Sequence, residues 1–281
     1  KLRNTLRWLL GSLHHYSDET RVPHDEMPEL ERYVLHRLAE LDETVRKGYA
    51  DYDFKRVMTA VFSFATVDLS AFYFDIRKDA LYCDPASSRT RHACLTVLHE
   101  IFAHVTTWLA PMLPFTMEEV WLSRFPEDEG SVHLLAFPAV DAGWRDEALA
   151  DKWRKVRRVR RVVTGALEIE RAGKRIGSSL EAAPVVYVDD PELRAAVEGV
   201  DLAEISITSQ AGLGEGDAPA YAYRLEEVPG VAVAFALAEG RKCARSWKIL
   251  PEVGSDPDYP DITPRDAKAM REFEAAKIAA E

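Results

Sequence analysis

Apolar side chains recur every three or four residues through the first half of the chain, which is the spacing of one face of an α-helix. The pattern predicts four amphipathic helices and a short fifth one. Together they form a helical bundle over residues 1–145. The four helices are predicted at residues 1–13, about 30–48, about 54–76, and from an N-cap at Ser88 to a stop before Pro111.

The fifth helix follows a proline corner at residues 105–121. Pro111 ends the preceding helix and Pro114 pre-sets the turn. Thr116 and Glu119, three residues apart, then form a predicted capping box that opens the short helix. The corner is rich in tryptophan, leucine, methionine and phenylalanine, so we expect other helices to bury it.

The hydrophobic period changes after residue 145. A helix is predicted from near Asp146 to about Ala172, and short alternating runs typical of strands follow it. The strand-like runs are 184–188, 204–208, 221–225 and 231–237, with one helical segment at 191–197. We therefore predict a small α+β domain over 146–239 and a polar tail over 240–281 with a helix at 264–279. The expected fold class is mainly α.

The 281-residue chain has a formal charge of −11, which argues against indiscriminate binding of nucleic acid. The charge is uneven, because residues 151–175 hold ten Lys or Arg against three acidic residues, a net +7. The rest of the chain therefore carries about −18, and one basic stripe on an acidic body favours selective contact with a polyanion.

No apolar run approaches the roughly 20 residues that span a bilayer, and no signal-like start is present. The chain begins at Lys1 with a helical pattern already under way, so we expect it to be part of a longer protein. Cys83, Cys94 and Cys243 are too few and too scattered for a disulfide framework, which favours a reducing cytoplasm.

Motifs that suggest catalysis do not hold up. His99 and His104 are five residues apart, not the four that place two histidines of a metalloprotease on one metal. The glycine-rich run 212–216 lacks a following Lys-Ser/Thr, and Glu215 would repel a phosphate. No triad is legible in the sequence. We expect no catalytic residue and no metal in this chain.

The basic helix has two interpretations. Lys and Arg on one side of a helix are commonly a solvated face. However, Arg157, Arg158, Arg160 and Arg161 crowd two turns with no acidic residue between them, which costs repulsion unless a polyanion or an acidic surface faces them. The sequence leaves both open.

Several runs carry a family resemblance. The proline corner is similar to the anticodon-binding helical domain of class I aminoacyl-tRNA synthetases for aliphatic amino acids. The runs 3–11, 69–82 and 174–182 resemble the C-terminal part of bacterial isoleucyl-tRNA synthetases in particular. The resemblance implies recognition of the anticodon and its stem in tRNA(Ile). It also implies a monomeric cytoplasmic protein that is not associated with a membrane.

In that family, catalytic and editing domains precede this region and attach isoleucine to tRNA with ATP and Mg. The family's HIGH and KMSKS signatures are absent here. The resemblance therefore implies tRNA recognition without catalysis, with the missing N-terminal domains as partners. The competing hypothesis is a non-catalytic protein-interaction module whose basic stripe docks on an acidic protein surface. Salt-dependent binding of tRNA would separate the two.

Many bacterial members of the family end in a four-cysteine zinc module. Here only Cys243 remains, and Ser246, Thr263 and Asp266 stand at the other ligand positions. Hydroxyls are poor zinc ligands beside thiolates, so we expect the tail to lack zinc. We expect apolar packing to hold it instead, through Trp247, Ile249, Leu250, Ile262 and Phe273.

The resemblance and the charge pattern give candidate tRNA-binding residues. Phosphates would be contacted by Arg3, Asn4 and Arg7 on the outer face of the first helix and by Arg171, Lys174 and Arg175 at the end of the basic helix. Anticodon bases stack on aromatic rings and Arg planes, which suggests Arg245 and Trp247 in the tail. Arg245 is expected to be isolated there and to gain little from packing, which favours contact with a base. Trp247 could instead anchor the core of the tail, and a tail without zinc favours that role over base contact.

Overall fold

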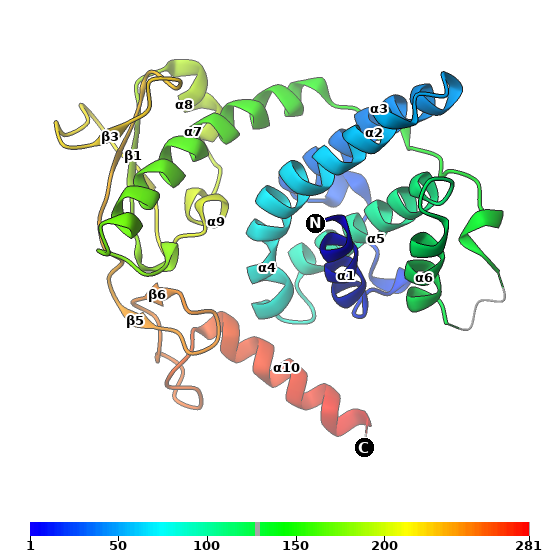
Figure 1. The fold of residues 1–281 in the computed structure, drawn as a ribbon. Coiled ribbons are helices and arrows are strands. Elements are labelled where there is room, and N and C mark those ends of the chain that lie inside the picture. Colours follow the sequence, from blue (N-terminus) through cyan, green and yellow to red (C-terminus); the bar gives the residue numbers. More distant parts are fainter. Residues whose placement is uncertain (127–129, 281) are drawn as a thin grey trace. The chain divides into compact units, whose positions relative to one another are not determined.

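The computed structural model describes residues 1–126 and 130–280 (Figure 1). It divides into two compact units. The helical unit comprises Lys1–Leu81 and Ser87–Glu147, and the mixed unit comprises Tyr82–Ala86 and Ala148–Glu281. The tail thus belongs to the mixed unit, and the three-part division expected from the sequence stays a prediction.

The helical unit confirms the predicted bundle. Helix α2 packs against α3 and α5, and α1 packs against α5 and α6. Ser88 caps α5 as expected, its hydroxyl accepting a hydrogen bond from the Arg91 backbone. The helices are α1 (Leu2–Leu13), α2 (Glu29–Ala50), α3 (Phe54–Ser63), α4 (Phe74–Cys83), α5 (Arg89–Leu109) and α6 (Pro114–Arg124).

The proline corner is only partly as predicted. Trp108, Leu109 and Met117 are fully buried, but Phe115 is 90% exposed. Helix α6 begins at Pro114 itself, without a side-chain cap, so the predicted capping box at Thr116 is wrong. Proline fits the first position of a helix because the amide hydrogen it lacks would have had no intrahelical acceptor.

The predicted third helix is a longer composite. A π-helical segment, Phe64–Tyr73, joins α3 to α4. The whole run Phe54–Cys83 is long and apolar enough to cross a membrane by length and composition, which the sequence reading missed. Core helices of soluble proteins pass the same test, and 44% of its most apolar window is buried in the structure. This run alone therefore does not indicate a membrane.

A buried ion pair joins α2 and α4 inside the bundle. The guanidinium of Arg77 donates to both carboxylate oxygens of Glu31, at 2.7 and 2.8 Å, and Tyr73 donates its hydroxyl to Glu31 at 3.0 Å. All three side chains are buried. The charges are therefore compensated at close range, as a buried carboxylate requires.

The mixed unit is built on α7 (Glu147–Ala172) and a four-stranded sheet of order β2-β1-β4-β3. Strand β1 pairs with β2 in parallel and with β4 antiparallel, and β3 pairs antiparallel with β4. Gly165 of α7 lies against Tyr223 of β3, where an added Cβ would stand 2.9 Å from the hydroxyl oxygen. The strands are β1 (Val185–Val188), β2 (Gly212–Leu213), β3 (Tyr223–Arg224) and β4 (Val231–Ala234).

Two short helices lie between β1 and β2. The first, α8 (Pro191–Val197), was predicted. The second, α9 (Leu202–Ser206), replaces the strand predicted at 204–208, which is therefore wrong. Asp201 caps α9 by accepting from the Glu204 backbone, and Ile207 ends it in a left-handed conformation. The apolar alternation around Ile205 came from a single helical turn.

The tail contains the hairpin β5 (Arg241–Lys242) and β6 (Ile249–Leu250), followed by α10 (Pro264–Ala280). The apolar packing expected to hold it is wrong in part, because Trp247 and Phe273 are 63% and 65% exposed. Cys243, Thr263 and Asp266 are buried instead. The inside of the tail is therefore largely polar.

Candidate nucleic-acid interface

The first candidate set lies on α1 in the helical unit. Leu6, Leu9 and Leu13 bury the inner face of this helix, so Arg3 and Arg7 project from the opposite side. Asn4 is exposed beside them. Neither arginine forms an ion pair with a described residue. Two cations one turn apart and free of partners suit contact with phosphates.

The second set surrounds the end of α7 in the mixed unit. The backbone N–H of Arg175 bonds to the Glu170 carbonyl at 2.9 Å, and that of Lys174 bonds to the Arg171 carbonyl at 3.0 Å. This pair of bonds is a Schellman motif, which places Lys174 at the left-handed position with φ of 56°. Glycine is the usual residue there because a Cβ is strained in that conformation.

Lys174 keeps its charge available despite that strain. Its side chain is exposed and makes no hydrogen bond or ion pair within the described part of the chain. Arg171 pairs with Glu168 on the same helix, and Arg175 pairs with Glu170 at 2.9 Å while lying over the ring of Phe235. Lys174 is therefore the freest cation of this set.

The basic stripe on α7 has two faces. Arg160 is half-buried and donates to the Ile205 carbonyl at the end of α9, so its role is structural. Arg158 is exposed and has no ion-pair partner among residues 1–126 and 130–280. Arg161 faces Glu227 at 3.9 Å, at the edge of ion-pair distance. Only part of the stripe is thus a surface available to a ligand.

In the tail the two base-contacting candidates differ. The premise that Arg245 is isolated is wrong: it pairs with buried Asp266 at 2.8 Å and donates to the carbonyls of Tyr82 and Cys83. Trp247 is not a core anchor but an exposed ring, in a left-handed conformation with φ of 64°. The ammonium of Lys242 lies 5.9 Å from its ring centre.

These contacts set what each group can offer a ligand. An exposed indole beside a cation is suited to stacking on a base. The guanidinium of Arg245 is occupied by three acceptors. Lys242 is a residue that sequence reasoning missed. It ends β5, and Trp247 follows five residues later in the connection to β6.

Comparison with known proteins identifies the family. Residues 31–187, more than half of the chain, match the family model of the anticodon-binding domain of tRNA ligase. The chain belongs to this family. The match covers α2 to α7 and extends into β1, so it includes the basic stripe and Lys174.

Curated relatives extend the match almost from end to end. The chain is 58% identical over 275 residues to the isoleucine–tRNA ligase of Brucella abortus biovar 1 (strain 9-941), covering 98% of this chain. It is 58% identical over 277 residues to that of Agrobacterium fabrum (strain C58) and 55% over 274 residues to that of Bartonella henselae (strain Houston 1). In each case it spans 28% of the relative's length. The resemblance read from the sequence is confirmed.

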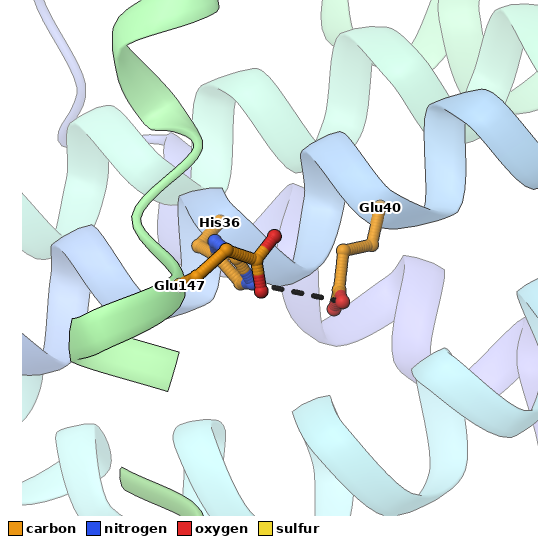
Figure 2. A group of neighbouring side chains, drawn as sticks. All are labelled: His36, Glu40 and Glu147. Atoms are coloured by element: carbon orange, nitrogen blue, oxygen red, sulfur yellow. Dashed lines mark ion pairs between the residues drawn. The ribbon is translucent and has the colours of Figure 1, made fainter. Parts of the chain in front are cut away.

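Among the described residues, one group in this anticodon-binding domain has the composition of a metal site. Figure 2 shows His36 and Glu40 from α2 facing Glu147, with ligand atoms within 4.8 Å of one another. However, His36 Nδ1 accepts the Asp146 backbone N–H at 2.9 Å, so neutral His36 carries its proton on Nε2, toward the carboxylates. That nitrogen has no lone pair for a metal.

The two carboxylates of the same group also have cationic partners. Arg37 pairs with Glu40, and Arg145 pairs with Glu147 at 2.8 Å. The group therefore links α2 to the start of α7 within the helical unit rather than holding an ion.

Proposed function

We propose that this chain binds the anticodon and anticodon stem of tRNA(Ile) as part of an isoleucine–tRNA ligase. The family match and the named relatives support this function. The longer protein would attach isoleucine to tRNA with ATP and Mg in the cytoplasm, as a monomer. Its catalytic and editing parts would be the partners of this chain within one polypeptide.

The observation that carries the proposal is Lys174. It lies inside the family match and holds a strained conformation that glycine would adopt freely. Its ammonium has no ion-pair partner among the described residues of a chain of net charge −11. Strain of this kind persists at functional positions when the side chain is needed there. A phosphate of the tRNA backbone is the ligand that this ammonium fits.

Arg3, Asn4, Arg7, Arg171 and Arg175 are proposed as further phosphate contacts, and Trp247 as a surface on which an unstacked base rests. The contacts of Arg245 with Asp266 and two carbonyls favour a role inside the protein over base contact. Phosphate contacts should control how binding depends on salt, whereas base contacts should control the preference for the cognate tRNA.

The test is binding of tRNA(Ile) and of a non-cognate tRNA to the 281-residue chain across a series of salt concentrations. We expect affinity to fall as salt rises, with a slope that decreases by about one in Lys174→Ala for both tRNAs. Trp247→Ala should weaken the cognate complex by about 1–3 kcal/mol and the non-cognate complex less. Absence of salt-dependent tRNA binding would favour the protein-interaction module.

We also propose that this chain has no catalytic activity of its own, because the family's catalytic signatures are missing from its sequence. Isoleucine-dependent exchange of pyrophosphate into ATP measures the activation step directly. The chain should give none above background, and measurable exchange would overturn this part of the proposal.

A further inference from the structure

Four buried positions in the tail have the spacing of a zinc module. Cys243 and Ser246 are separated by two residues, as are Thr263 and Asp266, with residues 247–262 between the pairs. Two such pairs at this separation are typical of a four-cysteine zinc site. The fold brings all four positions into one place at the junction of the β5–β6 hairpin and α10.

The side chains present do not fit zinc. A structural zinc site needs thiolate or imidazole ligands, and this set contains one thiol, two hydroxyls and one carboxylate. The carboxylate is also occupied. Asp266 Oδ2 accepts the Thr263 hydroxyl at 2.5 Å and lies 3.4 Å from the Cys243 sulfur, while Oδ1 accepts from Arg245 at 2.8 Å.

The remaining bonds close the cluster on itself. The Asp266 backbone N–H donates to the Thr263 hydroxyl at 3.2 Å, and the Ser246 backbone N–H donates to the Cys243 sulfur at 3.4 Å. The Ser246 hydroxyl is the exception, since it is buried and has no hydrogen-bond partner in the described structure. Three of the four positions therefore share a bonded network, and the fourth contributes only its backbone.

Arg245 connects this network to the end of α4. Its guanidinium donates to the carbonyl of Tyr82 at 2.7 Å and also to that of Cys83, both in the same unit as the tail. The last carbonyls of a helix lack intrahelical partners and favour a cation. One side chain thus neutralises the buried Asp266 and caps α4.

We propose that Asp266, Cys243, Thr263 and Arg245 form a metal-free fastening that replaces a zinc site in holding the tail together. Arg245 is then a positioning residue. It fixes the turn between β5 and β6 whose next outward-facing side chain is Trp247. The proposal does not rest on tRNA binding, and it can be tested without tRNA.

The structure supplies a matched pair of variants. Asp266→Asn keeps the size of the side chain but removes the charge that Arg245, Thr263 and Cys243 share. Ser246→Ala removes a hydroxyl that has no hydrogen-bond partner in the described structure. Ser246 is the second residue of its pair, as Asp266 is of the other pair. A zinc site would need both positions, whereas the fastening needs only Asp266.

Hydrogen exchange measured by mass spectrometry reports how often the tail opens. We expect Asp266→Asn to speed exchange in residues 240–266 and 82–86 at least about tenfold, and Ser246→Ala to leave it within about twofold. Arg245→Ala should match Asp266→Asn, and Arg245→Lys should restore part of the protection because a cation remains. Equal effects of Asp266→Asn and Ser246→Ala, or no effect of Asp266→Asn, would overturn the proposal.

Metal content gives a second test. Untagged wild-type chain should contain no stoichiometric zinc by elemental analysis, and EDTA should leave the exchange of the tail unchanged. One zinc per chain, or faster exchange in EDTA, would overturn the metal-free fastening.

A gain-of-metal variant tests the geometry. Combining Ser246→Cys, Thr263→Cys and Asp266→Cys with the native Cys243 places four thiols at the four positions. We expect about one zinc per chain, and thiolate-to-metal absorption when cobalt(II) is supplied instead. Failure of this variant to take up either metal would contradict the convergence of the four positions.

Discussion

Each unit contains a buried carboxylate paired with an arginine, and the two pairs are built differently. Glu31 and Arg77 lie inside the bundle, where both side chains are excluded from water and Tyr73 adds a third bond. Asp266 is equally buried in the tail, but 28% of the Arg245 side chain is exposed. The guanidinium of Arg245 also donates hydrogen bonds to two carbonyls at the end of α4.

The difference shows what each pair does for its unit. Large apolar side chains such as Trp108 and Phe102 already form the core of the bundle, so its ion pair adds one polar link between α2 and α4. The tail has few buried apolar side chains, among them Val253 and Ala267, so its polar cluster forms most of its interior. The same chemistry is thus a minor part of an apolar core in one unit and a large part of the interior in the other.

The largest effect should come from breaking the bundle pair. Glu31→Gln removes the carboxylate charge that faces the buried guanidinium of Arg77, which should cost about 3–5 kcal/mol in the free energy of unfolding. Asp266→Asn should cost less, about 1–3 kcal/mol, and only within the tail. Urea unfolding monitored by circular dichroism measures the first, and exchange of the tail the second.

A double variant controls that comparison. Glu31→Met with Arg77→Met removes both charges and should be more stable than Glu31→Gln alone, because no uncompensated charge remains. If Glu31→Gln unfolds at the wild-type urea concentration, the pair contributes nothing and the contrast between the units fails.

The stabilities of the two units should depend differently on pH. Burial lowers the pKa of His104, against the opposing influence of Glu100 and Asp42, so the folded bundle holds this histidine neutral. The contribution of neutral His104 to the free energy of unfolding is complete above the pKa of the unfolded chain, about 6.5, and is lost as pH falls below that value. Burial alone would raise the pKa of Asp266, but the bonds from Thr263 and Arg245 outweigh it and lower the pKa.

The tail should therefore loosen only below about pH 4, where a carboxylate of ordinary pKa takes up its proton. The thermal stability of the bundle should decrease between pH 7 and 5. Over the same range the hydrogen-exchange rate of the tail, corrected for the intrinsic rate, should stay constant. His104→Phe should reduce the dependence of bundle stability on pH without abolishing it, because burial also lowers the pKa of His15, His24 and His99. A tail that opens at pH 5.5 would contradict this order.

Stability and binding should change in opposite directions at Lys174. Lys174→Gly relieves the left-handed strain and should stabilise the mixed unit by about 1 kcal/mol, while it removes a proposed phosphate contact. Lys174→Gln keeps the strain and loses the charge, so it should weaken tRNA binding without the gain in stability. A thermal melt and a salt series measure the two quantities. A loss of stability in Lys174→Gly would show that the side chain has a structural role.

The helices of the bundle were predictable because Leu30, Leu38 and Leu98 follow a period that tertiary packing preserves. The helix α9 was not, since five residues give too few turns to separate a helix from a strand. The resemblance supplied the anticodon-binding family and drew attention to Lys174 and Trp247. Neither the left-handed conformation of those two residues nor the bond from Arg245 to Tyr82, 163 residues away, has a signal in the sequence.

The smallest expected effect distinguishes two arginines on one helix. Arg158 and Arg160 are two residues apart on α7, and both belong to the basic stripe predicted from the sequence. Arg160 bonds the Ile205 carbonyl, so Arg160→Ala should cost about 1–2 kcal/mol of stability through the unpaired carbonyl and lost packing. Arg158→Ala should stay within about 0.5 kcal/mol of wild type, because the side chain is exposed.

For tRNA binding the order should be reversed, with a larger effect of Arg158→Ala than of Arg160→Ala. If the exposed face of α7 meets a polyanion, Arg158→Ala lowers the salt slope for tRNA by about one, and Arg160→Ala leaves the slope unchanged at temperatures where the protein is folded. Urea unfolding and a salt series on the same two variants give both readings. Equal slopes in the two variants would mean that this face of α7 is only solvated, and phosphate contact would then be confined to α1 and the end of α7.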